Sequence, residues 1–161
     1  MLVPIRATYA DDLLGTAVQA SLLPKRQAAM IHERTYFSTV RNVGLLRRGT
    51  PVVFYESGKS NGRAAAIALA RVRSTVVVSK RKIAPALVEC GVLGEDDLDQ
   101  MTVGEQVSAT IVDNVMKLRS PVGLKRLREL GCIDGANLVT SRSISADQLQ
   151  RIISEGQGTS E

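Results

Sequence analysis

Few residues in this sequence could form a metal centre or a conventional catalytic group. His32 is the only histidine, and the two cysteines, Cys90 and Cys132, lie far apart and belong to no CxxC motif. A structural zinc site takes about four cysteine or histidine ligands, more than the chain provides. His32 lies in the segment MIHERTYF, which is typical of the entrance to a strand rather than of a catalytic turn. We therefore expect no metal, no cofactor and no catalytic residue.

The aromatic residues are gathered in one part of the chain, where basic residues are also frequent. All five aromatic side chains lie within the first 55 residues of 161. Aromatic rings can stack on nucleobases, and interleaved cations can bind phosphates. Neighbouring side chains point to opposite faces of a strand, so one member of each pair Tyr36-Phe37 and Phe54-Tyr55 can line a cleft. The alternative is that the tyrosines only cover the edge of the core. The candidates are Arg34, Tyr36, Arg41, Tyr55, Lys59 and Arg63.

Two further segments allow a ligand interpretation and a structural one. The loop Gly58–Arg63, GKSNGR, could cradle a phosphate, but the P-loop pattern is absent and Asn-Gly is a strong signal for a hairpin turn. Its position predicts that residues 51–56 and 64–73 are neighbouring antiparallel strands joined by residues 57–63. The acidic set Glu95, Asp96, Asp97 and Asp99 suits the first turn of a helix better than a calcium loop.

The remaining patterns predict strands interrupted by short helices. Strands are expected at residues 2–6, 35–37, 52–55, 64–78, 106–115 and 138–140, by their β-branched or alternating composition. Helices are expected after Thr8, within 22–31, after Ser79, at 122–130 and after Ser145. This order lacks regular βαβ alternation. It predicts one α+β domain over residues 1–155, built on a small, mostly antiparallel barrel, with a disordered tail at 156–161.

Composition and charge narrow the class of protein. The chain is 44% hydrophobic and 23% charged, and it carries a net charge of +5, which makes a polyanionic partner more plausible than an acidic composition would. No apolar run is long enough to span a membrane, and the segment MLVPIR lacks the apolar core of a signal peptide. We therefore expect a cytoplasmic protein with no membrane contact, in which both cysteines are reduced thiols.

The segment from Thr35 to Val72, TYFSTVRNVGLLRRGTPVVFYESGKSNGRAAAIALARV, resembles the core of the PUA-like superfamily, in particular its ASCH and EVE branches. The matching pieces are IRATYADDLLG, ERTY, GTPVVFYES and AIALARV. The later segment from residue 122 to residue 153 is similar to the closing part of ASCH-like domains attached to bacterial acetyltransferases or regulators. The resemblance implies a single PUA-like domain, a pseudo-barrel of five or six strands with short surrounding helices.

The same resemblance implies a cleft beside the first helix that binds nucleic acid, either RNA or DNA with a modified base. The protein would then be a non-catalytic, regulatory binding module. Tyr36 or Tyr55 would stack on a base, and Glu56 and Ser57 would bond to its edge. The phosphates would be bound by Arg34, Arg41, Lys59 and Arg63.

Two alternatives remain open. The first is an amidohydrolase that acts on an acylated nucleoside, for which Lys25, Thr35 and Glu56 are the candidate residues. The second is a regulatory or interaction domain that works with a separate protein partner, such as an acetyltransferase or a toxin. A contiguous exposed apolar patch would favour this second alternative.

Overall fold

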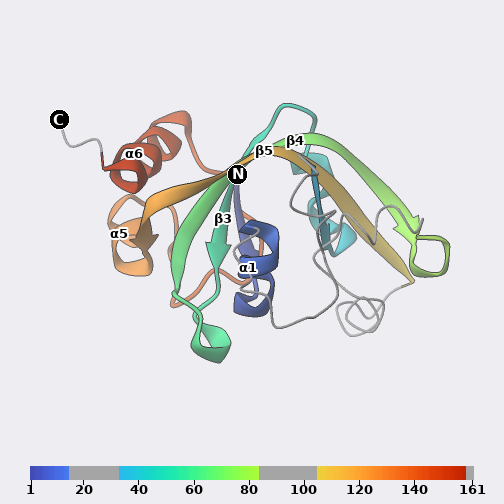
Figure 1. Ribbon diagram of the computed structural model, residues 1–161, viewed down its shortest axis with the longest axis horizontal. Coiled ribbons are helices and arrows are strands. Elements are labelled where there is room, and N and C mark those ends of the chain that lie inside the picture. Colours follow the sequence, from blue (N-terminus) through green and yellow to red (C-terminus); the bar gives the residue numbers. More distant parts are fainter. Residues whose placement is uncertain (15–32, 84–104, 159–161) are drawn as a thin grey trace, which may run out of the picture. The chain divides into compact units, whose positions relative to one another are not determined.

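The computed structural model describes residues 1–14, 33–83 and 105–158. They form an α+β fold with a five-stranded, mostly antiparallel sheet and a few short helices, as predicted (Figure 1). The chain divides into two compact units, each built from separate stretches. Unit 1 comprises residues 1–10, 51–70 and 116–161, and unit 2 comprises residues 11–50 and 71–115. The expected helix at 22–31, the acidic set at 95–99 and Cys90 lie outside the described residues.

The sheet has the strand order β1-β3-β4-β5-β2. Its strands are β1 (Leu2–Ile5), β2 (Arg34–Ser38), β3 (Pro51–Glu56), β4 (Ala65–Ser79) and β5 (Gln106–Gly123). In unit 1, β1 pairs with β3 in parallel, so that Leu2 lies opposite Val53 and Ile5 opposite Glu56. In unit 2, β2 pairs with β5 in the antiparallel direction. The predicted adjacency of the strands on either side of the 57–63 loop is confirmed.

The long strands extend further than their sequence patterns indicate. β4 covers the predicted strand at 64–78, whereas β5 continues eight residues beyond the expected end at residue 115, to Gly123. Asn114 has a positive φ of 51° inside β5. Positive φ at a non-glycine residue within a strand is typical of a bulge, which bends the strand locally. The alternation that marks a strand in sequence is broken there, and this hides the continuation of β5.

The helices are short and lie at the ends of strands. They are α1 (Ala7–Leu14), the 3₁₀ turns η1 (Val40–Leu45), η2 (Lys59–Asn61) and η3 (Lys80–Lys82), α5 (Leu124–Glu129) and α6 (Ala146–Gln157). The expected strand at 138–140 is wrong, because only one isolated bridge forms nearby, between Leu2 and Arg142. α6 continues through Gln157, so it takes in the first two residues of the segment expected to be a disordered tail.

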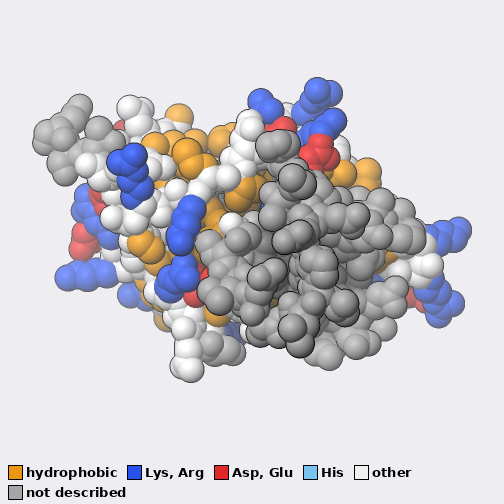
Figure 2. All heavy atoms as spheres, in the orientation of Figure 1, with side chains coloured by type: hydrophobic (Ala, Val, Ile, Leu, Met, Phe, Trp, Pro, Cys, Tyr) orange, Lys and Arg blue, Asp and Glu red, His pale blue; other side chains and the backbone are white. Residues whose placement is uncertain are grey.

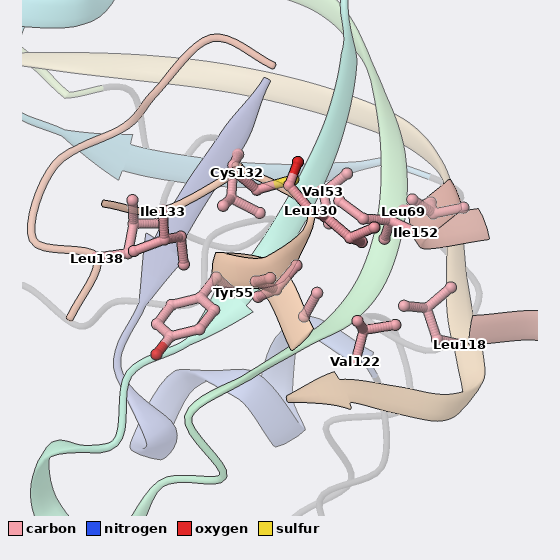
Figure 3. Packing of buried hydrophobic residues seen from close by; sticks show 13 residues of the cluster. Val53, Tyr55, Leu69, Leu118, Val122, Leu130, Cys132, Ile133, Leu138 and Ile152 are labelled. Carbon is pink, nitrogen blue, oxygen red and sulfur yellow. The ribbon is translucent and has the colours of Figure 1, made fainter. Parts of the chain in front are cut away.

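The core of unit 1 is almost entirely aliphatic (Figure 3). Leu118, Leu127 and Ile152 are fully or almost fully buried and pack in one cluster with Leu2 and Val53. Burying one such side chain contributes about 1.5–3 kcal/mol. The free thiol of Cys132 is buried in the same cluster, and burial raises its pKa. The cluster joins β1, β3, β4 and β5 to α5 and α6, so the end of the chain completes the core begun by its first residues.

A capping box fixes the start of α6, and its first member is Ser145, the helix cap that the sequence predicts. The Ser145 hydroxyl accepts a hydrogen bond from the Gln148 amide at 3.1 Å, and the Gln148 side chain accepts one from the Ser145 amide at 2.9 Å. These two bonds satisfy amides that the first turn of a helix otherwise leaves without acceptors. They position Ile152 to face the core of unit 1.

Replacing the capping serine should weaken unit 1 measurably. Ser145→Ala removes an acceptor for a helix amide, and the free energy of unfolding should fall by about 1 kcal/mol in urea denaturation. Ser143→Ala is the matched control, because Ser143 is exposed and lies outside the capping box. Equal stabilities of the two variants would contradict the role of the cap.

Candidate nucleic-acid interface

The carboxyl ends of β1 and β3 bring a buried acid to the edge of the sheet in unit 1. Glu56 is the last residue of β3 and is only 4% exposed. Its Oε1 accepts a hydrogen bond from the Arg63 backbone amide at 2.9 Å. Its Oε2 lies 3.5 Å from Arg63 Nη1 in an ion pair, but it accepts no hydrogen bond. Glu56 and Arg63, both predicted as site residues, are thus brought together by the loop between β3 and β4.

The rest of that loop is held by backbone contacts. The Ser57 amide donates to the Ile5 carbonyl at 2.9 Å, and the Ser57 hydroxyl accepts from the Lys59 amide at 3.4 Å. Gly62 packs so closely that a Cβ there would lie 1.8 Å from the Ser57 carbonyl oxygen. The loop therefore folds back on itself, and Lys59 projects into solvent from it.

A side chain at position 62 should break this arrangement. Gly62→Ala forces the loop away from the Ser57 carbonyl, and overpacking of this kind costs about 1–3 kcal/mol of unfolding free energy. Gly44→Ala is the control, because a Cβ at Gly44 would meet no atom within 4 Å. Chemical denaturation of both variants checks this expectation, and a harmless Gly62→Ala would contradict the tight packing.

Tyr55 lies in the core and offers no surface for stacking. Phe54 and Tyr55 both have 0% exposure, although their side chains point to opposite faces of β3. Residues on both faces of β3 are buried, and Tyr55 packs in the cluster that includes Leu127, Leu138 and Ile152, so alternation exposes neither ring. The Tyr55 hydroxyl is buried without a hydrogen-bond partner, and burial raises its pKa, with a smaller opposing effect of Arg128. The base-stacking role expected of Tyr55 is therefore not supported.

In unit 2 the alternation along β2 follows the predicted pattern. Thr35 and Phe37 are buried, whereas Arg34, Tyr36 and Ser38 are partly exposed. Tyr36 lies opposite Thr110 of β5, and burial of its phenol raises the pKa to about 12. The Arg34 guanidinium donates to the Glu33 carbonyl at 3.1 Å. Arg41 lies in the 3₁₀ turn η1 of the same unit.

The raised pKa of Tyr36 predicts a loss of stability in alkali. A phenol with a higher pKa in the folded state stabilises the fold below pH 10, and this contribution disappears as the pH rises from 10 to about 12. Tyr36→Phe should therefore lose less stability than the wild type between pH 9 and pH 11, as measured by urea midpoints. Tyr55, whose pKa is also raised, is present in both proteins and cancels in the comparison. Parallel pH curves would contradict the burial of the Tyr36 hydroxyl.

Lysine and arginine side chains lie at several places on the surface, some of them beside acidic side chains (Figure 2). The basic residues of unit 1 fall into two groups. Some lie in ion pairs: Arg63 with Glu56, Arg126 with Glu129 and Glu155, Arg142 with Asp134, and Arg151 with Asp147. Others are exposed and form no ion pair with a described carboxylate, and these are Arg6, Lys59, Lys117, Arg119, Lys125 and Arg128. Of the predicted phosphate-binding residues in unit 1, Lys59 belongs to the second group and Arg63 does not.

Lys117 and Arg119 were missed by sequence reasoning. They lie two residues apart in β5, on either side of the buried Leu118, so their side chains share one face of the strand. The alternation Lys-Leu-Arg was a signal for this arrangement, but the expected strand ended before it. The structure thus adds a pair of solvent-facing cations that belong to a strand rather than to a loop.

The structure describes only some of the residues proposed for the amidohydrolase. Thr35, proposed for the amidohydrolase, is buried and its hydroxyl has no hydrogen-bond partner, and Lys25 lies outside the described residues.

In the described parts of the chain, no group of three or more metal-ligating side chains gathers. None of the helices described is long and apolar enough to cross a membrane. The large apolar side chains exposed in unit 1 are Met116 and Val139, which come from β5 and from the segment before α6.

The strand order, the parallel β1–β3 pair and the short flanking helices define the α+β fold of the chain. More narrowly, the fold is that of an ASCH domain. The crystal structure of ASCH from Zymomonas mobilis aligns with a TM-score of 0.66 at 13% identity, over 95% of this chain and 92% of that one. A serine-to-alanine variant of the same protein gives a TM-score of 0.69 at 11% identity, over 96% and 94%.

A Pseudomonas putida protein is also similar, with a TM-score of 0.51 at 16% identity, over 97% of this chain and 99% of that one. No protein-family model and no curated protein sequence matches the chain. Identities this low establish the shared fold, and the resemblance seen in the sequence is confirmed at that level.

Proposed function

We propose that this protein is a non-catalytic domain that binds single-stranded nucleic acid, RNA or DNA. The observation that carries the proposal is the group of exposed cations in unit 1 that have no ion pair with a described carboxylate. A cation that already pairs with a carboxylate must lose that partner before it binds a phosphate, whereas an unpaired one need only release water and counterions. The ASCH fold supports the proposal by analogy alone. Proteins that share a fold can differ in function, because function depends on the residues of the site.

The unpaired cations occupy two places in unit 1. Lys117 and Arg119 share a face of β5, about 7 Å apart along the strand. Arg6 and Lys59 lie near the carboxyl ends of β1 and β3, where Ser57 bonds to Ile5. Lys125 is exposed and follows Leu124, whose amide donates to the Ala64 carbonyl at 2.9 Å, just after the β3–β4 loop. A flexible single strand can follow such spaced charges, which need not match the groove of a rigid duplex.

The salt dependence of binding tests the electrostatic part of the proposal. Each phosphate contact to a single strand adds about 0.7 to the slope of log affinity against log salt. The double variant Lys117→Gln, Arg119→Gln should therefore lower the slope by about 1.4 for a fluorescent oligonucleotide followed by anisotropy. Arg151→Gln is the matched control, because Arg151 is exposed but pairs with Asp147. Absence of binding at low salt, or an unchanged slope in the double variant, would refute the proposal.

Stacking on Tyr36 is tested separately in unit 2. Tyr36→Ala should weaken binding by about 1–3 kcal/mol and leave the salt slope unchanged, because stacking releases no counterions. Tyr36→Phe keeps the ring and should bind like the wild type. Equal affinities of the alanine variant and the wild type would remove Tyr36 from the interface.

A further inference from the structure

One oxygen of the Glu56 carboxylate accepts a hydrogen bond, and the other accepts none. Oε1 accepts from the Arg63 amide at 2.9 Å, whereas Oε2 is buried and accepts no hydrogen bond. Burial without a hydrogen bond is costly for a polar atom, and more so for a charged one. An atom left in this state in a folded protein calls for an explanation, and a ligand that supplies the missing donor is one.

The Arg63 guanidinium forms an ion pair with Oε2. Nη1 lies 3.5 Å away, and the Arg63 side chain is 42% exposed, whereas that of Glu56 is 5% exposed. The backbone amide of Arg63 holds Oε1 independently of the guanidinium. A ligand donor can therefore take the position beside Oε2 while the main-chain bond keeps the carboxylate in place.

The surroundings suit a nucleotide. Glu56 is in register with Ile5 at the carboxyl end of the parallel pair, and the next residue, Ser57, has a hydroxyl that is partly exposed. The exposed cations Arg6 and Lys59 lie within three residues of Ile5 and Glu56 in sequence. The Glu56 carboxylate only accepts hydrogen bonds, so it would select a base that presents N–H donors. The neighbouring cations would bind the phosphate of the same nucleotide.

Resting on the proposed function, we infer that Glu56 reads the Watson–Crick edge of an unpaired guanine. A carboxylate is an acceptor only and can take two parallel hydrogen bonds. Guanine presents two adjacent donors on that edge, N1–H and the N2 amino group. Adenine and cytosine place a ring acceptor beside their amino group, and uracil flanks its single N–H with two carbonyl oxygens. Oε2 would accept one guanine donor, and Oε1, which retains a second lone pair, the other.

The test uses the full chain and labelled octanucleotides of uridine that differ only at one central base. Replacing the central uracil by guanine should tighten binding roughly tenfold, since a good bidentate contact discriminates bases to about that extent. Inosine, which keeps N1–H but lacks the N2 amino group, should lose most of this gain. Equal affinities for the guanine and uracil strands would overturn the inference.

Glu56→Gln supplies the second arm. It keeps an oxygen for the Arg63 amide but presents a donor in place of the second acceptor, so the preference for guanine should fall to less than about twofold. The salt slope on the all-uridine strand should remain that of the wild type. Glu129→Gln is the control, because this carboxylate pairs with Arg126 on the surface of unit 1. A guanine preference that survives Glu56→Gln would also overturn the inference.

Two further comparisons keep the result decisive. If Glu56→Gln does not fold, Arg63→Gln leaves the backbone bond to Oε1 intact, and it should retain or increase the guanine preference. The comparison of guanine with inosine needs no variant at all. A protein that binds the all-uridine strand with the expected salt slope but ignores the central base fails this inference alone. A protein that binds no strand at low salt fails the proposed function as well.

Discussion

The parallel pairing of β1 with β3 is the constraint on which the candidate site depends. It places the ends of both strands at one edge of unit 1, where the Ile5 carbonyl receives the Ser57 amide. Once Ser57 is held there, Glu56 is directed inward and the loop to β4 must turn back over it. The close approach of Gly62 to the Ser57 carbonyl is part of the same turn. A buried carboxylate is acceptable at this position because the Arg63 amide and guanidinium both approach it.

The basic residues differ in whether they form ion pairs with carboxylates of the described residues. Arg126 binds Glu129 within α5 and Glu155 of α6, so only the second pair joins the two helices, and the pair of Arg71 with Asp113 joins β4 to β5 in unit 2. These arginines connect neighbouring elements at the surface. A single exposed ion pair there contributes at most about 1 kcal/mol to the free energy of unfolding. Lys117 and Arg119 of β5 and Lys59 of the β3–β4 loop form no such ion pair with a carboxylate of the described residues.

Local sequence signals predicted the elements that local chemistry determines. The Asn-Gly turn predicted the β3–β4 adjacency, and Ser145 predicted the start of α6. Features set by neighbours distant in sequence were not accessible in this way. Tyr55 is buried because it packs in one cluster with residues far along the chain, such as Leu127 and Leu138, and Arg63 is paired because its loop brings it to Glu56. For the same reason, Lys117 and Arg119 were overlooked when the bulge at Asn114 interrupted the pattern of β5.

The discontinuous make-up of unit 1 has a consequence for synthesis on the ribosome. Its core needs residues from β1, β3, α5 and α6, so the first strands cannot be fully covered until Ile152 has been made. Translation of the roughly 100 residues between β3 and α6 takes on the order of 5–20 s at ordinary elongation rates. During that time Leu2, Val53 and Tyr55 lack the α6 side chains that cover their cluster in the folded protein. Until α6 is made, the nascent chain therefore exposes apolar side chains of unit 1 that are buried in the folded protein and that chaperones can bind.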